Sequence, residues 1–396
     1  MDDKKRLSFV HLYKFIAAIL IALFLHYNDH FIPSLGDDIK NNFLDNDFLG
    51  MLCTCSFCLV EFFFIFSGML FMKVFVPRIT SNEYDLKKFL KNRIIRIMPY
   101  LFVTTCIMFL LEIISVELTE DVWSGVGSID VTELILNIVL FGNGAANRVS
   151  LNGPVWYLSV LMICYILGYF LAKIYYKYKN ELVFLIPIFV GLVVYLNSGA
   201  FRGLLNYNVS RGLVSFFIGI LLYYYMKKYD NINKKYKTYI KIILSAIVIS
   251  IFIILAFGAY EDYLGNMIII GNFLLFPSII YISYNSKILN KICDNKFIKF
   301  LGDLSFDIYI LNFIILCSTF LIIKKLDIND DILNKKWLLI WFIIVLEHLV
   351  ICVVANFIRK KIRSSIKKEI EKKKKENISI NTNCNEKTIE EEQQKV

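Results

Sequence analysis

The sequence carries little charge for its length. Asp, Glu, Lys and Arg make up 20% of its 396 residues, whereas about a quarter is usual for soluble domains. Hydrophobic residues make up 57%, and the mean hydropathy is +0.58. This composition excludes an ordinary soluble enzyme.

Period-two alternation of polar and apolar residues is also lacking, which excludes an outer-membrane barrel. The apolar residues instead form runs that can cross a hydrocarbon core of about 30 Å, which takes about 20 helical residues. Every backbone N–H and C=O inside the hydrocarbon must be paired within the chain, so each span must be a helix. We therefore predict an all-α, polytopic membrane bundle of about ten transmembrane helices. Their expected ranges are 8–27, 50–72, 97–115, 155–176, 181–197, 212–226, 239–258, 264–284, 304–323 and 337–358.

The charges in the loops between these spans predict the orientation of the chain. Loops such as 73–96 and 227–237 are rich in Lys and Arg, whereas the alternate loops, such as 28–49, lean acidic. Basic loops stay in the cytoplasm. We therefore expect both termini to be cytoplasmic and the protein to cross the plasma (inner) membrane several times.

The net charge of +10 comes mostly from one end of the chain. Residues 359–376 contain ten Lys or Arg and three Glu. Basic residues beside a membrane helix hold that end in the cytoplasm and contact anionic lipid, so we expect membrane lipid as a partner and no nucleic acid. The predicted domains are a transmembrane domain over 1–358 and a cytoplasmic tail over 359–396, basic at first, then polar and disordered.

The cysteines indicate neither a metal site nor a bound cofactor. The nine cysteines lie mostly within apolar runs, where thiols act as small hydrophobic groups. The cluster of Cys53, Cys55 and Cys58 has no second group of ligands at zinc spacing. The longest outer loop, 116–154, contains a short apolar piece at 134–141, which we expect to enter the membrane partway or to lie on its surface.

Ionisable residues within spans are costly and mark functional sites by default. Each of those found here is a candidate for chemistry inside the membrane. They are His11, Lys14 and His26 in the first span, Glu61 in the second, Arg93 and Arg96 at the cytoplasmic end of the third, and Glu347 and His348 in the tenth.

These residues belong to a longer ordered pattern. Lys14 and His26 bracket an Ala-containing apolar run, Glu61 precedes Phe63-Phe64 and Ser67-Gly68, and Arg93-x-x-Arg96 precedes Pro99. Further along come Val155-Trp156-Tyr157-Leu158, Arg211 with Phe216 and Gly219, and Gly302-Asp-Leu-Ser305-Phe-Asp-Ile-Tyr309. With these motifs in this order, the sequence resembles the acyltransferase-3 family. Members of that family are integral membrane enzymes that O-acylate sugars of cell-surface polysaccharides with cytoplasmic acyl-CoA.

The resemblance implies a membrane-bound O-acyltransferase that moves acetyl from cytoplasmic acetyl-CoA, the donor substrate, to a hydroxyl of a cell-surface or lipid-linked glycan. This reaction needs a base for the hydroxyl proton, and imidazole titrates near neutral pH. We assign His26 as that base and expect Glu61 to orient it through the other ring nitrogen, as the acid does in hydrolase triads. The alternatives are that His26 lies in the outer interface beside Tyr27 and that Glu61 makes a helix-packing hydrogen bond.

Lys14 belongs to this catalytic set only if it shares a helical face with His26. The family places ten residues between the two, which leaves them within about 20° on a regular helix. This sequence has eleven, which turns them about 120° apart. A one-residue π-bulge between Ala17 and Leu25 would absorb the extra residue, and such bulges favour functional sites. Our hypothesis is that this bulge is present; on a regular helix Lys14 would lose its assigned role.

Arg93 and Arg96 share one helical face on the cytoplasmic side. Guanidinium forks suit phosphates, so the resemblance implies that both arginines bind acyl-CoA. The alternative is membrane anchoring, although Lys87, Lys88 and Lys91 already serve that purpose.

Four further residues are expected to bind the acceptor: Trp156, Tyr157, Arg211 and Asn312. Trp156 and Tyr157 begin the fourth span at its outer end, where the alternative to stacking on a sugar is an interface belt. Asn312 stands where the family motif often has His. Its amide can hydrogen-bond but cannot transfer a proton.

Three residues are secondary candidates. We expect Ser67, together with Gly68, to form a close helix contact rather than to act as a nucleophile. Glu347 and His348 have no counterpart in the family pattern. Consecutive side chains on a helix point about 100° apart, so we expect these two to serve different purposes.

The route of the acyl group stays open at this level. Lys14 and His26 are about 18 Å apart along a helix, so either the pantetheine arm reaches His26 through a channel or one residue carries a transient acetyl group. We favour direct transfer because no Cys or Ser stands plainly beside a base. The acyl group can also be succinyl or longer, and neither the acceptor sugar nor the oligomeric state follows from the sequence.

The alternative function is a transporter or flippase, since buried charges in ten spans would suit a carrier. Carriers commonly have two related halves with broken helices at matching positions. The sequence shows no such symmetry.

Overall fold

Every element that the computed structural model describes is a helix. The structure describes residues 5–36, 38–39, 47–126, 129–140, 150–197, 203–256 and 264–393. Within these ranges nine helices are long and apolar enough to cross a membrane, and Glu181–Leu196 is a shorter apolar helix. These segments correspond to the ten predicted spans, so the polytopic helical architecture is confirmed.

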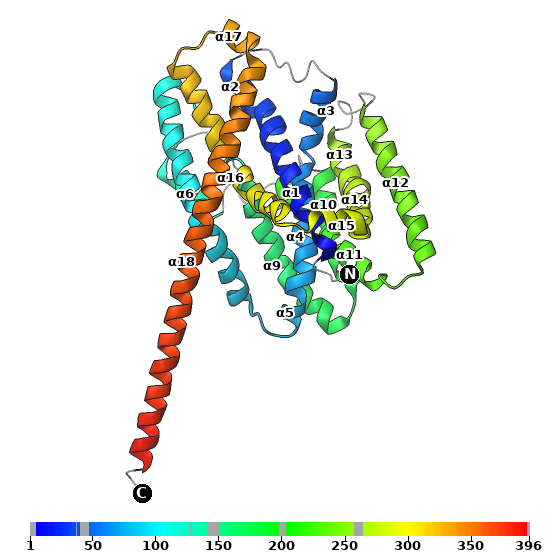
Figure 1. The fold of residues 1–396 in the computed structure, drawn as a ribbon, viewed down its shortest axis with the longest axis vertical. Coiled ribbons are helices and arrows are strands. Elements are labelled where there is room, and N and C mark those ends of the chain that lie inside the picture. The colour runs from blue at the N-terminus through cyan, green and yellow to red at the C-terminus, as the bar shows by residue number, and fades with distance from the viewer. Residues whose placement is uncertain are drawn as a thin grey trace. The chain divides into compact units, whose positions relative to one another are not determined.

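Figure 1 shows the helices along the chain. The first half comprises η1 (Lys5–Leu7), α1 (Phe9–Leu20), η2 (Ile21–Leu25), η3 (Tyr27–Phe31), α2 (Ile32–Leu35), α3 (Asp47–Ser56), α4 (Leu59–Leu70), η4 (Phe71–Phe75), α5 (Val76–Thr80), α6 (Leu86–Thr119), α7 (Val131–Ile138) and α9 (Val155–Tyr178). The second comprises η5 (Glu181–Phe184), α10 (Leu185–Leu196), α11 (Tyr207–Lys228), α12 (Lys234–Ala256), α13 (Leu264–Ile270), η6 (Gly271–Leu275), α14 (Phe276–Tyr284), α15 (Lys287–Cys293), α16 (Lys296–Lys325), α17 (Asp330–Lys335) and α18 (Trp337–Gln393). The segments η2, η3, η4 and η6 are π-helical, and η1 and η5 are 3-10 helices.

The chain divides into two compact units, Met1–Leu349 and Val350–Val396. α18 begins in the first unit, and its backbone is helical as far as Gln393, over a stretch where the sequence predicts a disordered tail. Lys and Glu are abundant there and are good helix formers. The functional residues described below all lie in the first unit.

The contact between α4 and α11 lies at the centre of the first unit. α11 is buried along most of its length. Two glycines permit the close approach: a methyl group at Gly68 would collide with the backbone carbonyl of Phe216, and one at Gly219 with that of Ile65. Small residues let membrane helices touch along their backbones. The helix contact predicted at Ser67-Gly68 is therefore confirmed.

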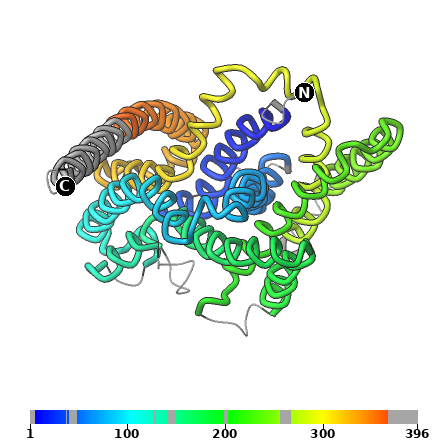
Figure 2. Tube along the Cα trace, turned by 90° about the horizontal axis from the view of Figure 1, so that it is seen from below, coloured from blue at the N-terminus to red at the C-terminus, as the bar shows by residue number. Residues whose placement is uncertain are grey.

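The first helix lies between α4 and α16. Figure 2 shows α1 and α4, both blue, side by side between the yellow-to-gold α16 and the green α11. At the contact with α16, the ring of His11 packs against Gly302, where any larger residue would meet the histidine. This contact determines which face of the first helix is turned towards α16.

The long loop after α6 contains a helix of its own. Part of the apolar piece predicted at 134–141 belongs to α7, whose N-terminus is capped by Asp130 through the Glu133 amide. The amide of Leu151 bonds to the Asn137 side chain at 3.1 Å, so the end of the loop is tied to α7. Residue 141, the last of the predicted apolar piece, lies outside the described residues.

Candidate functional site

The first span departs from a regular α-helix just before His26. Ile21–Leu25 is π-helical, and the amide of His26 bonds to the carbonyl of Ile21, five residues back. The predicted bulge is therefore confirmed. The indole N–H of Trp341 in α18 donates to the Leu23 carbonyl at 2.9 Å, so a tertiary contact supports the irregular turn.

Lys14 and His26 lie on the same side of this helix. His11 packs against α16, and His26 bonds to Asn312 of the same helix. Lys14 follows His11 by three residues and so lies on the same face, one turn along, where it interacts electrostatically with Asp303 of α16. The π-helical insertion thus provides the shared face on which the assignment of Lys14 depends.

A chain of hydrogen bonds joins His26 to α18. The Asn312 amide bonds to Nδ1 of His26 at one end and to Nε2 of His348 at the other, the latter at 3.1 Å. Nδ1 of His348 donates to the carbonyl oxygen of Ile344 at 2.8 Å. Asn312 and His348 are buried, and His26 is half-buried. One ring nitrogen of His26 is therefore held by the protein, and no partner among the described residues bonds to the other, Nε2.

The ring of Phe313 forms a wall beside His26. Its centroid lies 5.0 Å from that of His26, 4.8 Å from that of His30 and 5.2 Å from that of Trp123. The two histidine rings are 5.7 Å apart, as the i, i+4 spacing on one helix requires. These rings give the His26 imidazole partly apolar surroundings, in which electrostatic interactions are stronger than in water.

A buried carboxylate holds Trp123 in this position. Glu112 of α6 accepts the backbone N–H groups of Trp123 at 3.0 Å and of Ser124 at 2.9 Å. The indole N–H of Trp123 donates to Ser34 Oγ at 3.1 Å. These three hydrogen bonds attach the loop after α6 beside the histidines.

Glu61 forms a buried ion pair with Arg211 of α11 and does not bond to His26. Nε and Nη2 of Arg211 donate to the two carboxylate oxygens, the second at 3.2 Å. Nη2 also donates to the Phe57 carbonyl at 3.2 Å, at the break between α3 and α4, where carbonyls lose their helical partners. The predicted orienting role of Glu61 is therefore wrong for this arrangement, because α4 turns the carboxylate towards α11. Asn312 holds His26 instead.

Trp156, Tyr157 and Ser67 make contacts between helices. The guanidinium carbon of Arg211 lies 5.1 Å from the centre of the half-buried Trp156 ring. The Tyr157 hydroxyl donates to the Phe63 carbonyl at 3.2 Å and lies 2.9 Å from Ser67 Oγ. These contacts join α9 and α11 to α4. Ser67 has a tyrosine rather than a base as its partner.

Arg93 and Arg96 have different environments. The guanidinium carbon of Arg93 lies 3.8 Å from the centre of the Phe75 ring and 5.2 Å from that of Tyr165, and the side chain is half-buried. Arg96 is exposed and lies within electrostatic range of Lys14. Of the two arginines, Arg96 is the more accessible to a phosphate.

Glu347 and His348 bond to different residues of the same helix, α16. Oε2 of Glu347 accepts the Thr319 hydroxyl at 2.7 Å, whereas His348 bonds to Asn312. Both partners lie on α16, about two turns apart. His348 therefore belongs to the network around His26, and Glu347 contacts a separate part of the same helix.

Three residues of this site were not found from the sequence: His30, Phe313 and Trp123. The predicted first span ends at 27, whereas the helix continues to Leu35. The i, i+4 spacing of His26 and His30 was the available signal. Phe313 and Trp123 gave none, because their proximity to His26 depends on contacts between distant segments.

The geometry suits proton transfer, and the comparisons give the class of reaction. A half-buried histidine with one ring nitrogen fixed and the other open can take a proton from a hydroxyl. In the described part of the chain, no group of three or more His, Cys, Asp or Glu is placed to hold a metal ion. A family profile described as Acyltransferase domain matches residues 7–357, while no curated protein and no solved structure gives a significant match. The chain therefore belongs to the acyltransferase-3 family and is a multi-pass membrane acyltransferase.

Proposed function

We propose that the protein transfers an acetyl group from cytoplasmic acetyl-CoA to a hydroxyl of a cell-surface or lipid-linked glycan. It would do so in the plasma (inner) membrane, with both termini in the cytoplasm. The observation that carries the proposal is the position of His26, within a span and bonded through one ring nitrogen to Asn312. Family membership supports the acyl-transfer chemistry.

In the proposed reaction, Nε2 of His26 accepts the proton of the acceptor hydroxyl as its oxygen attacks the thioester carbonyl. A C–O bond forms, the C–S bond breaks, and the proton passes from His26 to the departing CoA thiolate. General base catalysis of this kind typically contributes about 10²- to 10⁴-fold to the rate. Because the Asn312 amide does not titrate, the proton taken from the acceptor and its positive charge stay on the His26 imidazole.

We place the acceptor beside Phe313, His30 and Trp123. Aromatic rings suit the apolar faces of sugars, and the polar atoms of His30 can bond to hydroxyls. Trp156, Tyr157 and Arg211 are assigned to the support of α4 instead, because their polar groups and rings already have protein partners.

We place the phosphates of the donor at Arg96, with Lys14 and Arg93 nearby. These three cations lie towards the end of the membrane domain that loop charge predicts to be cytoplasmic. The distance from Lys14 to His26, about 18 Å along a helix, is the distance that the pantetheine arm has to cover in direct transfer.

The test is incorporation of labelled acetyl from acetyl-CoA into glycan by membranes that contain wild-type protein or His26→Ala at equal expression. Glu347→Gln is the matched control, since it lies in a span but outside the His26 network. We expect label with the wild type and the control and none with His26→Ala. Label retained by His26→Ala would disprove the assigned base. Absence of label from every acyl-CoA tested would disprove acyl transfer from CoA and favour a transporter or flippase.

A further inference from the structure

Asn312 lies between two histidines, and the orientation of its amide determines their tautomers. Nδ1 of His348 lies 2.8 Å from the carbonyl of Ile344, which can only accept, so Nδ1 carries a proton. A neutral imidazole then has only a lone pair on Nε2. An amide oxygen at that position would need a second proton on the ring, which would bury a cation at high cost. His348 therefore requires the NH₂ end of Asn312.

The other end of the amide then fixes His26. The structure places Nδ2 of Asn312 nearest His26 and Oδ1 nearest His348. The two ends have the same shape and are assigned by the bonds that they make. Exchanging them satisfies both rings in their neutral forms. With the amide oxygen against Nδ1 of His26, that nitrogen carries the proton and Nε2 keeps its lone pair.

We propose that His348 fixes the orientation of the Asn312 amide, and that Asn312 thereby holds His26 in the tautomer whose Nε2 can accept a proton. Both are positioning residues, because they act through His26. The proposal rests on His26 being the base in the proposed function. It gives a role to His348, a residue on the last span that the motif pattern does not include.

The titratable groups that face His26 are histidines. His30 lies on the same span and His348 on α18, while α16 contributes the neutral Asn312. Asp29 interacts electrostatically with His30. A carboxylate at position 312 would therefore bring a negative charge into direct contact with both rings.

The first test uses full-length protein in detergent and diethyl pyrocarbonate, which modifies neutral imidazoles. The chain has four histidines, so peptide mass spectrometry reports the rate at His26 as a function of pH. In Asn312→Asp, the midpoint for His26 should move upwards by about one pH unit or more, because an adjacent negative charge favours the protonated ring. An unmoved midpoint would overturn the proposal. This readout needs no acetyl transfer, so it tests the effect of position 312 on His26 even if the proposed function fails.

The second test measures acetyl transfer. His348→Phe removes the acceptor for the Asn312 NH₂ group and should lower kcat about five- to ten-fold at unchanged KM, the effect of one hydrogen bond. His348→Gln, whose side-chain oxygen can accept, should restore most of that loss. Glu347→Gln, the adjacent control, should change neither constant. Wild-type kcat in His348→Phe, or equal losses in His348→Phe and His348→Gln, would overturn the role of His348.

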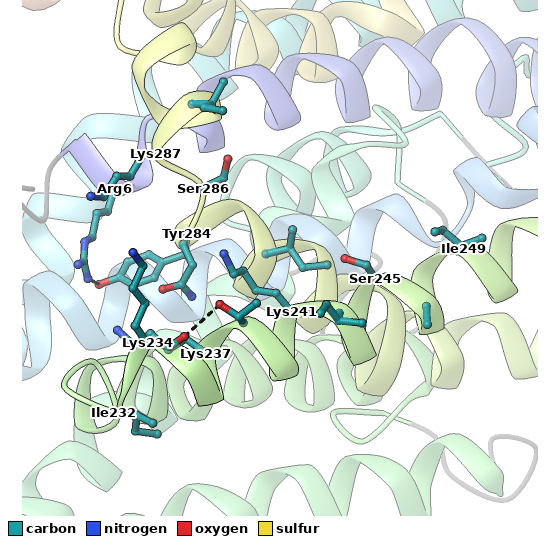
Figure 3. A pocket seen from close by; sticks show the side chains of 16 residues that line it. Arg6, Ile232, Lys234, Lys237, Lys241, Ser245, Ile249, Tyr284, Ser286 and Lys287 are labelled. Carbon is teal, nitrogen blue, oxygen red and sulfur yellow. Dashed lines mark hydrogen bonds between the residues drawn. The ribbon is translucent and has the colours of Figure 1, made fainter.

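An independent feature is a pocket of about 1250 Å³ between α12 and the α14–α15 segment. Figure 3 shows the basic side chains that line it, among them Lys234, Lys241 and Lys287. Arg6 and Lys237 also line it, and both pair with Asp230, at 2.6 and 3.1 Å. The Asp230 carboxylate offsets only one of the five positive charges that line the pocket, so the pocket carries a net positive charge.

The lining of the pocket changes from basic to apolar along α12. Lys234, Lys237 and Lys241 follow one another at three- and four-residue spacing, and Ser245 and Ile249 continue the same face. In Figure 3 the three lysines lie at one end of this face and Ser245 and Ile249 at the other. The whole face extends about 22 Å at 1.5 Å per residue. Such a gradient suits a ligand with an anionic head and an apolar chain.

We infer that this pocket binds an anionic phospholipid. Its phosphate would lie against Lys234, Lys241 and Lys287, and an acyl chain would lie along Ile242 and Ile249. Only 11% of the apolar window of α12 is buried, so this helix turns most of its surface towards the membrane. Loop charge places its lysine end at the cytoplasmic surface, where anionic lipids gather.

The test uses full-length protein in nanodiscs that contain photoreactive phosphatidylglycerol or photoreactive phosphatidylcholine. We expect phosphatidylglycerol to label α12 and α15 peptides at least five-fold more than phosphatidylcholine. Gln at positions 234, 241 and 287 together should abolish that preference. Gln at the exposed positions 173, 177 and 179, which removes the same charge elsewhere, should keep it. Equal labelling by the two lipids would overturn the inference, and so would displacement of phosphatidylglycerol by coenzyme A.

Discussion

The pair of Glu61 and Arg211 should stabilise the membrane domain rather than take part in the reaction. The two side chains are 0% and 3% exposed, and two N–H groups of the arginine meet the two carboxylate oxygens. Arg211 also satisfies the Phe57 carbonyl at the helix break. Removal of one member of such a pair leaves an uncompensated buried charge, which typically costs about 3–5 kcal/mol.

Arg211→Met removes the cation and keeps most of the side-chain volume. We expect it to lower the free energy of unfolding by about 3–5 kcal/mol, with about 1–3 kcal/mol more from the unsatisfied Phe57 carbonyl. Adding Glu61→Leu should recover several kcal/mol, because apolar replacement of a buried ion pair is often neutral or stabilising. The measurement is a double-mutant cycle from denaturant titrations in mixed micelles, followed by circular dichroism.

An exposed ion pair provides the control. Arg78 and Glu83 lie 3.9 Å apart with side chains about half exposed, so Arg78→Met should change the unfolding free energy by less than about 1 kcal/mol. The reasoning is refuted if the double variant is no more stable than Arg211→Met. It is refuted in a different way if Glu61→Gln keeps wild-type stability and loses acetyl transfer about 100-fold or more, the size of an acid–base contribution, since the carboxylate would then have a chemical role.

Three further predictions concern the bulge, the donor site and a pair at the membrane surface. Deletion of Ala22 leaves ten residues between Lys14 and His26, which a regular helix keeps within about 20° of one face, so acetyl transfer should be retained; loss of transfer by a variant that still folds in detergent would show that the bulge does more than absorb the extra residue. Arg96→Gln should raise KM for acetyl-CoA about ten-fold or more, the loss of a charge-assisted phosphate contact, and Arg93→Gln, whose guanidinium stacks on Phe75, should raise it less; the opposite order would exchange the two roles. Burial raises the pKa of the Asp230 carboxyl, but the hydrogen bonds and charges of Arg6 and Lys237 together lower it by more. The net pKa therefore lies below its usual value. Because the folded pKa is depressed, the stabilisation relative to Asp230→Asn should be complete above about pH 5 and decline as pH falls through about 4 and below; a difference that grows towards low pH in denaturant titrations would contradict the sign.

Local patterns in the sequence determined the spans and the irregular turn. Hydropathy alone gave the membrane helices, because the bilayer requires long apolar runs whose backbone bonds lie within the run. The π-helical insertion followed from comparing the eleven residues between Lys14 and His26 with the ten that the family resemblance implies, because one extra residue changes the helical phase by about 100°.

The pairing of polar groups across helices was decided only by the tertiary structure. Glu61 lies 150 residues from Arg211, and His26 lies 286 residues from Asn312. Periodicity shows which face of a helix a residue occupies, but not which other helix that face meets. The close contact of α4 with α11 at Gly68 and Gly219 turned the carboxylate towards Arg211. The contact of the first helix with α16 left the histidine to Asn312, because buried polar groups bond to whichever partner the packing brings within reach.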